Sequence, residues 1–273
     1  MPRGNSFGIK LLSVVMPAYK QERTIKKDIK SISATLDTLG LQYEIIVVVD
    51  GMLDGTFKKA SSLQSKKVKV VGYPQNHGKG HAIRYGMLYA SGDVIGFMDA
   101  GMDIRPTGMN MLLNHMVWYN ADIIVGSKLH PASKVAYPKY RTILSWGYRS
   151  LTHILFGFKV KDTQVGLKFF KRKVVRKVLP KLVVKRYAFD IEILAVAYSQ
   201  GYKRIYEAPI DISFKNGSIT SKNLWHIIFL MLWDTVAVFY RLRIIRYYYK
   251  NHSIKKKALL RRNSNLHLRL NNL

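Results

Sequence analysis

The stretch Asp93-Val-Ile-Gly-Phe-Met-Asp-Ala-Gly-Met-Asp103 decides the fold. Residues 93–98, which are apolar after Asp93, predict a buried strand that stops at Asp99 and enters a glycine-bearing turn ahead of Pro106. In open α/β sheets, ligands bind outside the carboxyl ends of such strands. Two carboxylates there, Asp99 and Asp103, suit a hard divalent cation that keeps some waters and bridges substrate phosphates. This segment alone leaves an alternative open, a solvated turn with Asp103 as a helix N-cap.

Four further apolar runs predict strands at residues 11–16, 43–49, 68–72 and 121–126. Between them, isoleucines and leucines at helical spacing over residues 25–39 predict one helix. Strands that alternate with helices predict an α/β fold with a mainly parallel sheet and right-handed crossovers.

Side chains that follow three of these strands are expected to meet. Tyr19, Asp50 and Asp99 each come after an apolar run, and parallel strands end along one edge. The layout is that of a nucleotide site, although any doubly wound fold shares it. No G-x-G-x-x-G follows the first strand and Gly78-Lys-Gly lacks the Walker A spacing, which disfavours dinucleotide oxidoreductases and P-loop proteins.

Composition narrows the partners of the 273-residue chain. The absence of cysteine excludes disulfides, thiolate metal sites and cysteine nucleophiles. The net charge of +29 indicates a polyanionic partner, either nucleic acid or an anionic membrane face. The first ten residues lack the apolar region of a signal peptide.

The second half of the chain is more basic and more apolar. Residues 141–158, 171–186 and 189–198 are expected to form helices, and residues 205–214 a late strand. Residues 224–240 are short for a membrane-spanning helix and predict a helix lying in the membrane interface, with Trp225, Trp233 and Tyr240 at headgroup depth. Residues 241–262 hold nine Lys/Arg and no acid, which suits an anionic leaflet. The alternative left open is a packed helix followed by a disordered basic tail.

Several motifs in a fixed order carry a resemblance to a known family. They are Val15-Met-Pro-Ala-Tyr-Lys-Gln-Glu22, Val49-Asp-Gly-Met-Leu-Asp-Gly-Thr56, Asn76-His-Gly-Lys-Gly-His-Ala82 with Ala90-Ser-Gly-Asp93, Asp162-Thr-Gln-Val-Gly-Leu-Lys168, Phe189-Asp-Ile-Glu192 and Glu207-Ala-Pro-Ile210. On these, the chain from about residue 11 to about residue 245 resembles the family-2 inverting glycosyltransferases with a GT-A fold. Within them it is similar to the dolichol-phosphate mannosyltransferase and glucosyltransferase branch.

The resemblance implies transfer of a hexose, mannose or glucose, from a GDP- or UDP-linked donor to a polyprenyl (dolichyl) phosphate with inversion. It implies Mg²⁺ or Mn²⁺ held by Asp99 and Asp103, with Arg141 and Lys168 as counter-charges for phosphate. The implied donor site consists of Pro17, Ala18, Tyr19, Glu22, Val48, Asp50, Asp54, Lys79, Asp99, Ala100, Gly101, Asp162, Gln164 and Lys215. A phosphate acceptor is already ionised and needs no strong base. A sugar-hydroxyl acceptor, the alternative, would need a carboxylate such as Glu192 or Asp162.

The sequence departs from the family pattern at the metal motif. The family's D-x-D reads Asp99-Ala-Gly101, so its second acid is missing, and Asp103 is assigned in its place. Lys20 and Gln21 replace Asn and Glu in the first motif, and Val49 replaces the first Asp of the second. A metal-poor variant or a noncatalytic nucleotide-sugar-binding protein therefore stays open as an alternative.

These expectations divide the chain into a catalytic domain (1–220), an amphipathic interfacial segment (221–250) and a basic tail (251–273). The expected location is peripheral or monotopic on the cytoplasmic face of an anionic membrane. A nucleic-acid partner is disfavoured because the aromatic residues cluster with aliphatic ones in apolar runs. Whether a membrane partner subunit or a homo-oligomer is required is left open.

Overall fold

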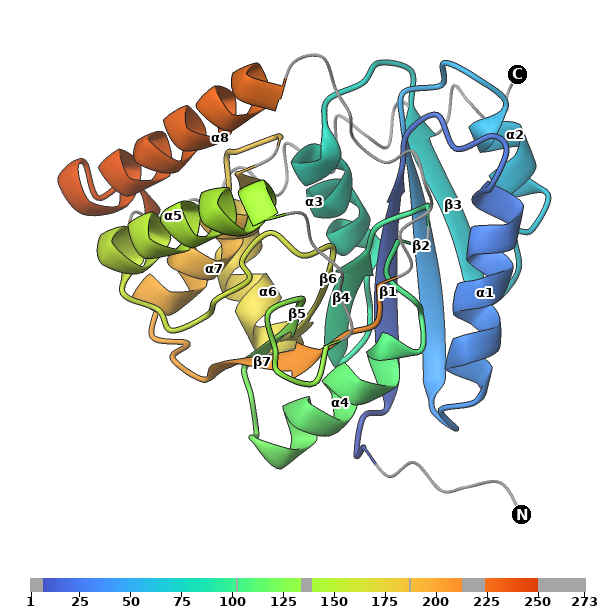
Figure 1. Ribbon diagram of the computed structural model, residues 1–273. Helices are drawn as coiled ribbons and strands as arrows, with labels where there is room; N and C mark the ends of the chain where they lie inside the picture. Colours follow the sequence, from blue (N-terminus) through green and yellow to red (C-terminus); the bar gives the residue numbers. More distant parts are fainter. Residues whose placement is uncertain (1–6, 102, 134–138, 187, 213–223, 250–273) are drawn as a thin grey trace.

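A seven-stranded sheet runs through the computed structural model, which describes residues 7–101, 103–133, 139–186, 188–212 and 224–249 (Figure 1). The strand order is β3-β2-β1-β4-β6-β5-β7. The strands are β1 (Leu11–Ala18), β2 (Gln42–Asp50), β3 (Val68–Tyr73), β4 (Val94–Met98), β5 (Ile123–Ser127), β6 (Leu167–Lys171) and β7 (Ile205–Pro209). β6 runs antiparallel to both of its neighbours, β4 and β5, and the other pairings are parallel. The predicted mainly parallel α/β sheet is confirmed.

Helices cover both faces of this sheet. They are α1 (Ile25–Asp37), α2 (Thr56–Ser61), α3 (Lys79–Tyr89), α4 (Gly108–Trp118), α5 (Lys139–Phe156), α6 (Arg172–Val178), α7 (Phe189–Ser199) and α8 (Leu224–Phe239), with the short turns η1 (Leu179–Lys181), η2 (Tyr240–Ile244) and η3 (Tyr247–Tyr249). Two glycines show which helix covers which face. A Cβ on Gly86 of α3 would meet Val48, whereas one on Gly72 would meet Val49 and Phe57 of α2. Successive strand residues point to opposite faces, so α2 and α3 lie on opposite sides of the sheet.

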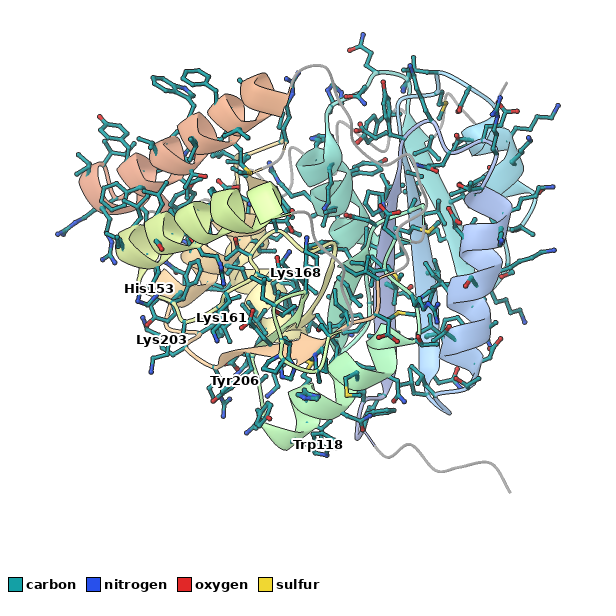
Figure 2. The ribbon with its side chains drawn as sticks, in the orientation of Figure 1. Trp118, His153, Lys161, Lys168, Lys203 and Tyr206 are labelled. Atoms are coloured by element: carbon teal, nitrogen blue, oxygen red, sulfur yellow. The ribbon has the colours of Figure 1, made fainter. Side chains whose placement is uncertain are left out.

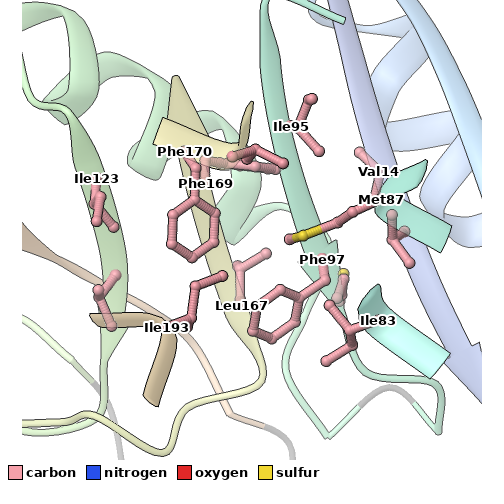
Figure 3. Packing of buried hydrophobic residues seen from close by; sticks show 14 of the residues in the cluster. Val14, Ile83, Met87, Ile95, Phe97, Ile123, Leu167, Phe169, Phe170 and Ile193 are labelled. Carbon is pink, nitrogen blue, oxygen red and sulfur yellow. The ribbon is translucent and has the colours of Figure 1, made fainter. Parts of the chain in front are cut away.

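The core lies between the sheet and its helices, and it includes residues of α1, α3, α4, α6 and α7. Figure 3 shows Phe97 of β4, Phe169 of β6 and Ile83 of α3 within this packing, and all three are fully buried. A Cβ on Gly96 would come within 1.9 Å of the Phe169 ring, so only glycine lets these two strands pair with that ring between them. The core holds β4 rigidly, and with it the position of Asp99 directly beyond its end.

The second half differs from its prediction around residues 167–186. A single basic helix over residues 171–186 was expected, but β6 occupies Leu167–Lys171, α6 ends at Val178, and η1 contains Pro180. The physical reason is pairing: the fully buried Phe169 and Phe170 fill the space between β4 and β5. The expected strand over 205–214 is confirmed for Ile205–Pro209, and its last two residues lie outside the described part of the chain.

α8 packs beside α5 on one side of the molecule (Figure 1), where the Tyr148 hydroxyl lies 3.0 Å from that of Thr235. Its outer face exposes Phe229 (61%) and Trp233 (66%), and Tyr240 follows it (51%). In the part of the chain that the structure describes, no helix combines the length and apolarity needed to cross a membrane. The predicted interfacial placement of this segment stays a prediction, and the side chain of Trp225 and the tail 251–273 lie outside the described residues.

Candidate active site

A pocket of about 450 Å³ opens at the carboxyl ends of β1, β2 and β4. Its walls are Pro17, Ala18, Tyr19, Gln21, Asp50, Asn76, Gly78, Lys79, Asp99, Ala100 and Arg186. The predicted meeting of Tyr19, Asp50 and Asp99 in one crevice is therefore confirmed. The cause is the parallel arrangement of the three strands that precede them, which places their ends on one edge.

Asp50 holds the loop that leads into α3. Its carboxylate is 3% exposed and accepts hydrogen bonds from the backbone N–H groups of His77 (2.7 Å) and Gly78 (2.9 Å). Gly78 has a φ of +96°, and a Cβ there would lie 2.7 Å from the carbonyl oxygen of Lys185. Asp50 thus orders the backbone on which Lys79 is presented to the pocket.

Asp99 stands at the end of β4 with its two oxygens in different environments. Oδ2 accepts a hydrogen bond from Nζ of Lys79 at 2.8 Å, whereas Oδ1 is buried and has no hydrogen-bond partner among the described residues. The backbone N–H of Asp99 donates to the carbonyl of Gly166 (2.9 Å), and a Cβ on Gly166 would lie 2.0 Å from Oδ2. These contacts hold the Asp99 carboxylate in place.

Charges of alternating sign run from this pocket into the core. Nζ of Lys79 lies 3.5 Å from Oδ2 of Asp190, and Oδ1 of Asp190 pairs with the fully buried Lys168. Burial opposes ionisation of Asp190, but Lys168 and Lys79 together hold the pKa of its carboxyl below the usual range. Burial likewise opposes the charge on Lys79, yet the carboxylates of Asp190 and Asp99 raise its pKa. Burial lowers the pKa of Lys168, and the carboxylate of Asp190 opposes this shift. Acidic and basic side chains therefore alternate from the pocket into the core.

Lys168 does not reach the pocket. Its Nζ donates to the carbonyl of Val165 and pairs with Asp190 inside the protein (Figure 2), so the structure corrects its expected contact with a phosphate. The reason lies in β6: Lys168 is the second residue of this strand, and its side chain points into the core toward α7.

Other predicted donor residues also have different surroundings. Glu22 accepts from the backbone of Gly55 (3.1 Å) and lies 3.2 Å from Lys59, while Asp54 accepts from the backbone of Thr56 (3.0 Å). Both therefore stabilise the start of α2. Val48 is fully buried toward α3.

Gly101 and Asp103 lie in the turn after β4. Gly101 has a φ of +98°, and its N–H donates to Asp28 (3.1 Å). Asp103 is exposed and lies outside the set of described residues that form the pocket wall. Gly101 carries no carboxylate, and the role of Asp103 as a metal ligand stays a prediction.

Asp162 and Gln164 line a second, smaller pocket of about 90 Å³ together with Lys161 (Figure 2) and Tyr148. Asp162 accepts from the backbone of Lys128 (2.9 Å), and Gln164 donates to the Tyr148 hydroxyl (3.1 Å). These two predicted donor residues therefore belong to a different hollow from Asp99. The side chain of Arg141 and the whole of Lys215 lie outside the described residues.

Arg186 and Asn76 line the pocket but are not among the site residues expected from the sequence. Asn76 lies in a quoted motif, so its position could have been found from the spacing to Lys79. Arg186 closes a basic run far along the chain. It reaches the pocket because the backbone of Lys185, beside it, accepts a hydrogen bond from the N–H of His81 in α3 (3.1 Å).

The pocket fits a divalent cation that arrives with a phosphate ligand. The described residues contain no group of three or more His, Cys, Asp or Glu side chains that could hold a metal ion on their own. Asp99 nevertheless offers a buried carboxylate oxygen without a partner from the described residues. Mg²⁺ commonly binds through one or two carboxylates plus substrate phosphates, so a single Asp99 oxygen is compatible with such a site.

Solved structures share this fold. Glucosyl-3-phosphoglycerate synthase from Mycobacterium tuberculosis, crystallised with Mn²⁺, UDP and phosphoglyceric acid, aligns with a TM-score of 0.62 and 22% identity over 85% of this chain and 78% of that one. The same enzyme with Mn²⁺, UDP-glucose and phosphoglyceric acid aligns with a TM-score of 0.63. The chain therefore shares the GT-A-like fold of these neighbours.

Sequence comparison identifies the family. The family model for glycosyl transferase family 2 matches residues 13–179, so the chain belongs to this family. It is 35% identical over 202 residues to dolichyl-phosphate beta-glucosyltransferase of Drosophila melanogaster and 34% identical over 204 residues to that of Homo sapiens. The matches cover 68% and 69% of this chain, but only 62% and 63% of those relatives.

Proposed function

We propose that this protein transfers glucose from UDP-glucose to dolichyl phosphate or a closely related polyprenyl phosphate, with inversion, at a membrane surface. The observation that carries the proposal is the pocket at the ends of β1, β2 and β4, whose wall brings Asp99 together with Lys79 and Arg186. The names of the curated relatives support the acceptor and the sugar, and the UDP complexes of the structural neighbours support the nucleotide.

In the proposed reaction an oxygen of the acceptor phosphate attacks the anomeric carbon of glucose. The bond from that carbon to the diphosphate breaks, and UDP leaves with the electron pair. Lys79 and Arg186 supply positive charge where the leaving diphosphate gains negative charge. Mg²⁺ or Mn²⁺ on Asp99, when bound, would add to that stabilisation.

The structure favours a phosphate over a sugar hydroxyl as the acceptor. A hydroxyl needs a carboxylate base, and the expected candidates are engaged elsewhere. Glu192 is fully buried and accepts hydrogen bonds from the backbone of Val183 and Val184 and from the Tyr248 hydroxyl (2.6 Å). Asp162 is buried and holds the backbone of Lys128. A phosphate acceptor is ionised at neutral pH and needs neither.

A donor screen tests the proposal. The full chain is incubated with vesicles that contain dolichyl phosphate and with radiolabelled UDP-glucose, GDP-mannose or UDP-N-acetylglucosamine, with and without a chelator. We expect label in the organic phase from UDP-glucose alone, and less of it with the chelator. Label on a short soluble sugar acceptor, with none on the lipid, would instead establish the hydroxyl-acceptor alternative.

A further inference from the structure

A third hollow, separate from the pockets at Asp99 and at Asp162, lies between α3 and α6, toward the opposite end of β4 from Asp99. It measures about 190 Å³, and Ile95, the second residue of β4, lies in its wall. The remaining wall residues are Arg84, Met87, Leu88 and Ala90 from α3 and its end, and Arg172, Val175, Arg176, Leu179 and Pro180 from α6 and η1. We call this hollow the arginine groove.

Among the described residues, three arginines and no acid contribute to its wall. Arg172 is partly satisfied, since its Nε donates to the carbonyl of Gly92 (2.6 Å) and its Nη2 lies 3.7 Å from Asp93. No described residue forms an ion pair with Arg84 or Arg176. Glu192 is the acid whose charge acts on Arg84, but its oxygens are engaged by Tyr248 and the backbone of Val183 and Val184. The groove therefore has positive charge to offer a ligand.

The same wall is apolar beneath the arginines. Met87 and Val175 are 3% exposed and Leu179 is 8% exposed, and Leu88 adds a half-buried apolar surface. Arginine binds phosphate through several donors, whereas the apolar side chains gain by covering hydrocarbon. A ligand that satisfies both halves carries an anionic group on an apolar chain.

Two features indicate where such a ligand comes from. Residues 250–273 of the chain hold seven Lys/Arg and no acid, so they do not complement three arginines. In addition, η1, which supplies Leu179 and Pro180, is tied to η3 because Nζ of Lys181 donates to the carbonyl of Tyr248. η3 follows α8 and η2, whose outer face exposes Trp233 and Tyr240. Exposed aromatic residues of this kind favour a membrane interface.

We propose that the arginine groove binds the phosphate headgroup of an anionic membrane lipid. Arg84, Arg172 and Arg176 hold the phosphate, and Met87, Val175 and Leu179 contact the first part of its chain. The site is separate from the donor pocket, because it lies toward the other end of the strand that carries Asp99. Its role is to hold the protein on anionic membrane independently of the reaction.

Titration calorimetry with a monomeric short-chain lipid tests this without the field of a whole membrane. We expect dihexanoyl phosphatidic acid to bind once per chain, and dihexanoyl phosphatidylcholine and inorganic phosphate to bind much more weakly. Arg84→Gln combined with Arg176→Gln should weaken binding about tenfold or more. The matched control is Lys26→Gln with Lys30→Gln, which removes the same charge from exposed residues of α1. This control should bind like the wild type.

Sedimentation with phosphatidylcholine vesicles, with and without phosphatidic acid, then tests whether the protein binds the anionic lipid within a bilayer. We expect the arginine variant to sediment less with the anionic vesicles than the lysine control does. Equal losses in both variants would overturn the proposal in favour of unspecific attraction, and equal binding of inorganic phosphate would exclude a lipid chain in the groove. If the double variant does not fold, Arg176→Gln alone serves, because that side chain is exposed. Wild-type affinity in the folded single variant would also contradict the proposal.

Discussion

The two hollows along β4 differ in how their charges are balanced. Asp99, at the carboxyl end of the strand, belongs to a chain of acidic and basic side chains in which Lys79 and Lys168 alternate with Asp99 and Asp190. The arginine groove, near Ile95, has three cations and no acid among the described residues of its wall. The first hollow is organised before any ligand arrives, whereas the second is left with positive charge.

This difference in charge indicates which class of ligand each hollow can bind. A site whose charges already compensate one another can bind a ligand whose negative charge is neutralised by its own counter-ion, such as a diphosphate together with a cation. A site with uncompensated arginines and an apolar wall takes an anion with a hydrocarbon chain. One strand therefore separates two kinds of recognition, and changes at one end should leave the other intact.

The largest expected effect comes from breaking the charge chain. Asp190→Asn leaves Lys168 fully buried without its carboxylate, and removing one partner of a buried pair costs about 3–5 kcal/mol of unfolding free energy. Urea denaturation measures it. The matched control is Asp37→Asn, which breaks an exposed pair with Lys67 (2.8 Å) and should leave stability close to wild type. Similar losses in both variants would show that the buried chain is not what balances the pocket.

The next largest effect separates the two hollows directly. Asp99→Asn removes a carboxylate charge from the pocket, and we expect glucose transfer to fall by about 100-fold or more, while lipid binding in the arginine groove is unchanged. Asp103→Asn should cost less, because Asp103 lies outside the pocket wall. Initial rates with saturating UDP-glucose measure both. An Asp103→Asn variant as poor as Asp99→Asn would identify Asp103 as the missing second ligand.

A smaller effect is expected from Lys79→Met. Lys79 faces both the pocket and Asp99, so its loss should weaken UDP binding about tenfold, as for one charge-assisted contact. Calorimetric titration with UDP measures this, and Lys20→Met, an exposed change nearby in the sequence, is the control. Unchanged UDP affinity would show that Lys79 serves Asp99 alone.

The smallest effect is the pH dependence of stability that His81, in the first turn of α3, contributes. The helix α3 begins at the pocket and ends at the arginine groove. Burial, with help from the charges of His77 and Arg84, lowers the pKa of His81 from 6.5 to about 4. Asp50 opposes this shift, Lys185 adds to it, and Tyr73 and Tyr85 pack against the ring. Because the unfolded chain takes up this proton first, the stability that His81 contributes is complete above pH 6.5 and is lost as pH falls toward 4.

Urea midpoints measured across that pH range test this dependence. His81→Gln should lose less stability than the wild type as the pH falls, because glutamine takes up no proton. Parallel curves for the two proteins would contradict the assignment.

The part of the site that follows parallel strands could be predicted from sequence. Tyr19, Asp50 and Asp99 each stand at the end of an apolar run, and such ends share one edge whatever the details of packing.

The rest depended on long-range pairing. The segment 167–171 is short and contains basic residues, and it forms a strand because β4 and β5 flank it. That pairing turns Lys168 inward toward Asp190 and leaves Asp162 and Gln164 beside Tyr148. Arg186 reaches the pocket through the contact of its neighbour Lys185 with α3, to which no local pattern points.

The most direct measurement is a crystal structure of the protein with UDP-glucose and Mn²⁺. We expect the nucleotide between Tyr19 and Asp50, the diphosphate beside Lys79 and Arg186, and the ion at Asp99. A nucleotide bound in another hollow, with Asp99 still paired to Lys79 and no density beside it, would contradict this assignment.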